Sequence, residues 1–81
     1  IGLSLDVFPN PSEGQATVAA FWPGSDAALE VRDAAGRLVY QAKLLGNGGR
    51  QVALNGLAPG VHFIGLISEN QRTVQRLLVL R

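Results

Sequence analysis

Short stretches in which apolar and polar residues alternate, each ended by proline, glycine or asparagine, recur along the whole chain. A period of two is the spacing of side chains on one face of a β-strand, and the turn residues mark where strands stop. No stretch of ten or more residues keeps a helical period without such an interruption. The pattern predicts an all-β protein, an antiparallel β-sandwich of about seven strands. The strands are expected at 3–7, 16–21, 28–33, 37–44, 51–54, 61–68 and 73–80.

The run Gly46 to Gly49 (GNGG) is the strongest turn signal, because glycine and asparagine tolerate positive φ. In the strand expected before it, the side chains of Leu38, Tyr40 and Ala42 should share one face.

Two adjacent aromatic residues, Phe21 and Trp22, end the second expected strand. Neighbouring residues of a strand point to opposite faces, so at most one of the two rings belongs to the core. The favoured interpretation is that Trp22 caps one end of the sandwich. The alternative is an exposed ring that stacks on a sugar or docks a partner.

The composition limits the function classes. The 81 residues allow one domain, and with 47% hydrophobic and 16% charged residues the chain is too apolar for a disordered tail. The net charge is +1 without a basic stripe, which argues against nucleic acid as a partner. Cysteine is absent, which excludes disulfides and thiol nucleophiles, and no apolar run approaches the ~20 residues that span a bilayer. Because the chain starts at Ile1 and lacks methionine, we expect it to be a fragment of a longer secreted protein. Residues 1–81 are expected to form a single domain of that protein.

Catalytic and metal-binding patterns are not apparent. His62 is the only histidine and has only scattered carboxylates for partners, so a partly buried structural histidine beside Phe63 is the favoured interpretation. The acidic residues do not follow the spacing of a calcium loop, and the serines lack the context of a nucleophile. We therefore expect a non-catalytic domain without a cofactor or metal.

The segment from Phe8 to Gly14 (FPNPSEG) predicts a rigid elbow between two strands. Pro9 and Pro11 fix their own φ and favour extended geometry in the residue before each. Asn10 can cap a turn, Gly14 permits a positive φ, and the prolines block pairing at an exposed edge.

Four motifs follow one another at fitting intervals. They are Pro9-Asn10-Pro11 with Gly14, DAAGRLV from Asp33, LAPGVHF from Leu57, and RLLVLR from Arg76. Together they resemble the C-terminal sorting domain of proteins exported by the type IX (Por) secretion system of Bacteroidetes-type bacteria, over about residues 5–81. The residues that carry this resemblance are Pro9, Asn10, Pro11, Gly14, Asp33, Gly36, Arg37, Leu57, Gly60, His62, Arg76, Val79 and Arg81.

The resemblance implies an Ig-like sandwich of the Greek-key type that follows an N-terminal cargo domain. It implies recognition in the periplasm by the type IX machinery, including an outer-membrane shuttle, and export to the cell surface or medium. In well-studied members a sortase-like peptidase then removes the domain and attaches the cargo to the surface. His62 stands where the family usually has a tyrosine, which could act as a corner residue that bonds to nearby backbone. Arg76 stands where a lysine is common.

The last expected strand is the segment that we expect to be recognised. An edge strand offers backbone hydrogen bonds that do not depend on the side chains of the cargo, and this one is terminal, aliphatic and flanked by Arg72, Arg76 and Arg81. Asp33, Gly36 and Arg37 should form the hairpin that presents it; the alternative is that Asp33 to Arg37 is only a good β-turn with a solvated Arg37. An uncovered edge could also pair two copies into a dimer. The alternatives are a fibronectin- or carbohydrate-binding-like accessory module, or a spacer in an adhesin.

Overall fold

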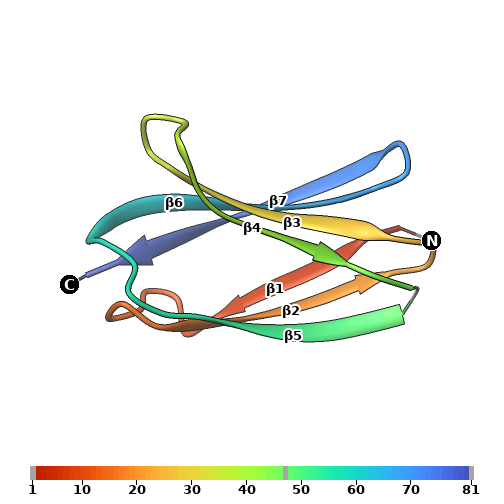
Figure 1. Ribbon diagram of the computed structural model, residues 1–81. Coiled ribbons are helices and arrows are strands. Elements are labelled where there is room, and N and C mark those ends of the chain that lie inside the picture. Colours follow the sequence, from red (N-terminus) through yellow and green to blue (C-terminus); the bar gives the residue numbers. More distant parts are fainter. Residues whose placement is uncertain (1, 47, 81) are drawn as a thin grey trace.

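The computed structural model describes residues 2–46 and 48–80 and contains two antiparallel β-sheets (Figure 1). The three-stranded sheet has the order β1-β2-β5, and the four-stranded sheet has the order β4-β3-β6-β7. The bounds are β1 Ser4–Phe8, β2 Ala16–Trp22, β3 Ala27–Asp33, β4 Leu38–Leu44, β5 Gly48–Leu54, β6 Gly60–Ser68 and β7 Gln71–Val79. The pairs β2–β5 and β3–β6 are not consecutive in sequence, which is the Greek-key arrangement of Ig-like sandwiches. The predicted all-β sandwich is confirmed.

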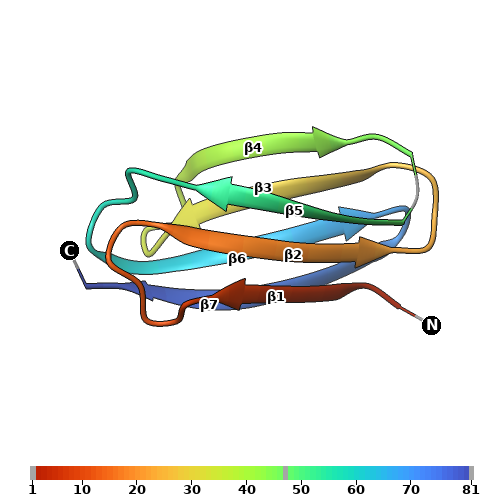
Figure 2. The ribbon, with the colours of Figure 1, turned by 90° about the horizontal axis from the view of Figure 1, so that it is seen from below.

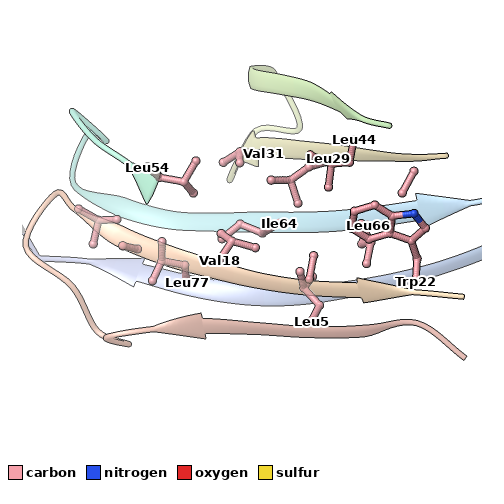
Figure 3. Packing of buried hydrophobic residues seen from close by; sticks show 14 residues of the cluster. Leu5, Val18, Trp22, Leu29, Val31, Leu44, Leu54, Ile64, Leu66 and Leu77 are labelled. Atoms are coloured by element: carbon pink, nitrogen blue, oxygen red, sulfur yellow. The ribbon is translucent and has the colours of Figure 1, made fainter. Parts of the chain in front are cut away.

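The core lies between the sheets and is filled by the alternate residues that the period of two selects (Figure 3). Val18, Leu29, Val31, Ile64 and Leu66 have no exposed surface. Full burial of such a side chain stabilises a fold by about 1.5–3 kcal/mol. The strands of both sheets therefore hold together through one shared apolar layer.

Trp22 lies at one end of this layer, as the favoured interpretation predicted. Its side chain is fully buried, and the indole Nε1–H donates to the carbonyl oxygens of Ser25 at 3.0 Å and Gly46 at 2.7 Å. Phe21 is 45% exposed and lies over Gly49 on β5, where a Cβ added to the glycine would lie 3.8 Å from the Phe21 ring. Because Trp22 is buried, it cannot form part of a sugar-binding platform.

Two local predictions were wrong. β5 starts at Gly48 rather than at residue 51, because Gly48 and Gly49 pair with Trp22 and Phe21 instead of forming only a turn. The remainder of that predicted turn includes Asn47, which lies outside the described residues. In β4 a bulge shifts the pairing, so that Tyr40 is opposite Val31 but Leu38 is opposite Arg32. Leu38 and Tyr40 therefore lie on opposite faces, since the bulge inserts one extra residue between them.

The described part of the chain contains no helix long and apolar enough to cross a membrane.

Candidate functional site

The four motifs meet at one end of the sandwich. The β1–β2 loop, the β3–β4 turn, the β5–β6 connection and the end of β7 all lie at the end opposite to the N-terminus (Figure 1). Figure 2 shows the same grouping from below. Residues far apart in the sequence therefore form one surface.

Asn10 joins the first motif to the last strand. Its Nδ2 donates to the carbonyl oxygen of Arg76 at 2.7 Å, and its Oδ1 accepts from the N–H of Leu78 at 3.1 Å. The amide side chain thus occupies the place that the backbone of a neighbouring strand would take. Asn10 was predicted to cap a turn in its own loop, whereas in the structure it binds a strand 66 residues away.

Ser12 extends this contact. Its N–H donates to the carbonyl oxygen of Leu78 at 2.9 Å, its carbonyl oxygen accepts from the N–H of Leu80 at 2.8 Å, and it forms a parallel bridge with Val79. Ser12 is 1% exposed. Sequence reasoning missed this residue, because a serine after a proline is typical of any surface turn and only its burial distinguishes it.

Pro9 and Pro11 hold this segment, and both of the peptide bonds that precede them are cis. The prolines were predicted to protect an edge at their own position. In the structure their segment lies along the edge of β7, so the edge that is covered belongs to the last strand.

Gly14 connects the first motif to the third. Its φ is 94°, a positive value as predicted, which L-residues with a side chain adopt only under strain. Its carbonyl oxygen accepts from the N–H of Leu57 at 3.3 Å. Leu57 packs against the core, and the connection in which it lies leads into β6 at Gly60. The first and third motifs are therefore in direct contact.

The second motif forms the turn between β3 and β4. The backbone of Asp33 pairs with that of Arg37, and the N–H of Gly36 donates to the carbonyl oxygen of Asp33, each at 2.9 Å. Oδ1 of Asp33 accepts from the N–H groups of Ala35 and Arg37 at 3.0 and 2.9 Å, while Oδ2 is 3.2 Å from Nε of Arg37. This carboxylate stabilises the turn. The turn does not adjoin the last strand, because β6 lies between β3 and β7.

His62 is more buried than the sequence indicated. It is 4% exposed and pairs with Asp33 on β3 and with Leu77 on β7, so it lies at the centre of the motif end. Its Nδ1 is buried and has no hydrogen-bond partner in the described chain. That nitrogen thus does not supply the bond expected of a corner residue.

A groove lies beside His62, between the start of β4 and the β5–β6 connection. It has a volume of about 690 Å³ and includes Tyr40, Leu57 and Pro59, with Asp33 and Arg37 among its lining residues. The second and third motifs therefore form its sides.

The terminal motif divides between core and surface. Val79 is 2% exposed and pairs with Gly60, whereas Arg76 is exposed and pairs with Phe63. Arg81 lies outside the described residues. Residues 2–46 and 48–80 contain no group of three or more His, Asp or Glu side chains that could hold a metal ion.

The arrangement is a surface on which the side chains of Asn10 and Asp33 bind backbone groups and the backbone of Ser12 binds the last strand. A family model described as "Secretion system C-terminal sorting domain" matches residues 6–80. The chain belongs to this family. No curated protein matches it. The sorting domain is a C-terminal signal for type IX secretion, which interacts with that machinery and directs an N-terminal cargo across the outer membrane to the cell surface or beyond.

The outer face of the four-stranded sheet of the sorting domain carries a small charged network. Oε1 of Glu30 lies 3.4 Å from Nη2 of Arg32 on the same strand and 3.7 Å from Nη2 of Arg72 on β7. Arg72 reaches over β6, where the residue opposite Glu30 is Gly65, which has no side chain. The ion pairs are partly exposed, so they add little to stability.

Acid should weaken the β3–β4 turn of the sorting domain through Asp33. The N–H of Arg37 is the main cause that lowers the pKa of Asp33 below its usual value; burial opposes this, and the Ala35 N–H and the Arg37 guanidinium reinforce it. A lowered folded-state pKa means that the carboxylate stabilises the turn fully above the unfolded-state pKa and loses this effect as pH falls through the folded-state value.

A carboxyl titration followed by NMR should therefore give Asp33 a midpoint below its usual value. The Ala35 and Arg37 amide shifts should move with it. In Asp33→Asn those amide shifts should stay constant over the same pH range. A normal or raised midpoint in the parent chain would contradict the role of this carboxylate.

Proposed function

We propose that the motif end is the surface that the type IX machinery recognises, and that the sorting domain acts there without catalysis. The recognition residues are those of the four motifs, and the machinery includes an outer-membrane shuttle and a sortase-like peptidase that reads the domain after the cargo has reached the periplasm. One observation carries the proposal. Asn10 and Ser12, near the start of the domain, hydrogen-bond to the strand that ends it.

This contact explains how a signal could be read only after folding. The surface around Leu78 exists only when the first and last strands have both formed, since no local segment contains all of its residues. Two of the four bonds join backbone to backbone and the other two join the Asn10 side chain to backbone, and all of them lie within the sorting domain, so the surface is independent of the cargo. A receptor for many different cargo proteins needs a shape of this kind.

A fusion experiment tests the proposal. Residues 1–81 are attached to the C-terminus of a periplasmic reporter, in a host with the type IX machinery and in an otherwise identical host without it. We expect the reporter at the surface or in the medium only in the first host. A reporter that remains in the periplasm of both hosts would contradict the proposal and favour the interpretation as an Ig-like accessory module.

A further inference from the structure

The outer edge of β7 is divided into a covered half and an open half. β7 is the last strand of its sheet, where β6 is its only neighbour among the described strands. Hydrogen bonds to the first motif show which backbone groups of β7 face away from β6. Asn10 or Ser12 binds the carbonyl oxygen of Arg76, the N–H and C=O groups of Leu78 and the N–H of Leu80. The backbone N–H and C=O groups of the even-numbered residues of β7 therefore point away from β6. From residue 76 onward the edge is already paired.

The open half comprises residues 71–75. Alternation along the strand turns the N–H and C=O groups of Arg72 and Val74 outward as well, and the register with β6 is unbroken over this range. No described residue pairs with these groups, because the segment that carries Asn10 ends its contact at Arg76. Unpaired groups on a straight edge can accept one more strand.

The side chains along this half are charged in a definite pattern. Arg72, Val74 and Arg76 share the outer face of the sheet, since they lie opposite Ile67, Gly65 and Phe63. All three are exposed, and Val74 lies over the gap that Gly65 leaves in the face. The edge therefore presents an apolar side chain between two cations.

This pattern disfavours a second copy of the chain as the added strand. Antiparallel pairing centred on Val74 would place Arg72 of one copy opposite Arg76 of the other, and parallel pairing in register would place identical arginines together. Like charges directly opposite each other destabilise a strand pair. Opposite charges in the same positions stabilise it, so the pattern favours an acidic partner.

We propose that residues 71–75 of β7 accept an extended segment of the secretion machinery that carries two acidic side chains four residues apart with an apolar one midway. The proposal rests on the proposed function and names the chemistry of its partner. Because the pattern is symmetrical about its apolar residue, it fits either strand direction. Asn10 ends the backbone pairing before Arg76, because it occupies the edge there. The second acidic side chain therefore lies just past the last paired residue, where it meets the exposed Arg76 side chain on the outer face of the sheet. Arg72 is free to turn from Glu30, because their 3.7 Å contact is partly exposed.

The first arm of the test removes one outward N–H. In Val74→Pro the N–H that is lost faces away from β6, so the hydrogen bonds between β6 and β7 are kept. Edge strands tolerate proline at such a position. Val74→Ala is the matched control, because it also loses the side-chain contact but keeps the N–H. In the fusion assay we expect export of the proline variant to fall about ten-fold, because one backbone hydrogen bond to the added strand is lost and that strand is less well aligned. The alanine variant should remain close to the parent.

The second arm reverses the charges. We expect Arg72→Glu with Arg76→Glu to lower export by about ten-fold or more. Lys43→Glu, an exposed charge reversal on β4 at the other edge of the same sheet, should leave export unchanged. Circular dichroism of each purified domain checks that it is folded. If the proline variant proves unfolded, the charge reversal decides alone.

The outcomes separate this inference from the proposed function. If the parent fusion is not exported in the competent host, the proposed function is wrong. If the parent is exported and the folded Val74→Pro and double-glutamate variants are exported equally well, the open edge is not used and only this inference is wrong. Sedimentation that shows a dimer of the parent, lost in Val74→Pro, would assign the edge to a second copy and would also overturn it.

Discussion

Replacing Trp22 with alanine should remove a large share of the stability of the domain. Single domains have unfolding free energies of about 0.05–0.15 kcal/mol per residue, or about 4–12 kcal/mol for 81 residues. Deleting a fully buried Trp side chain costs about 3–5 kcal/mol, and the carbonyls of Ser25 and Gly46 also lose their donor. Urea unfolding followed by far-UV circular dichroism measures the loss, since Trp22 is the only tryptophan and fluorescence disappears with it.

Phe21→Ala is the matched control, because it removes the adjacent aromatic ring from the opposite face. Phe21 is half exposed and lies over Gly49, so we expect a loss of about 1 kcal/mol or less. Trp22→Phe should fall between the two, since it keeps a ring in the core but lacks the N–H. Equal losses for the two alanine variants would mean that Trp22 does not hold the end of the sandwich.

Truncating the last strand should separate folding from recognition. A chain that ends after Arg76 lacks Leu77 and Val79, both buried, so it should lose about 2–5 kcal/mol for each. We expect it to be unfolded and not exported. A chain that ends after Val79 keeps both core residues and loses the hydrogen bond from the Leu80 N–H to Ser12, about 0.5–1.5 kcal/mol.

The second truncation is the informative one. We expect it to fold, with a cooperative urea transition, and yet to be exported about ten-fold less than the parent if the end of β7 is read directly. Replacing Leu80 by serine in the full chain is its control, because the backbone bond to Ser12 remains. Normal export of the chain that ends after Val79 would contradict the role of the terminal residues.

Most of the strands could be predicted, because the evidence for a strand is local. Alternation in residues 28–33 selects Leu29 and Val31, which the structure buries, and the turn at Asp33–Arg37 contains its own hydrogen-bond partners. The glycines at the start of β5 were misleading for the opposite reason. Their turn propensity is local, but pairing with β2 and cover from Phe21 outweigh it.

The sequence by itself determined the fold class, the turn at Asp33–Arg37 and the family, because periodicity, turn chemistry and motif order can all be read along the chain. Only the tertiary structure decided what the first motif does. Asn10 was predicted to serve its own loop, and it bonds to Arg76 and Leu78 because the packing of the two sheets brings β1 beside β7. The same packing buries Ser12 and leaves one half of the last edge open. Contacts across 66 residues depend on register and sheet order, and no local pattern encodes them.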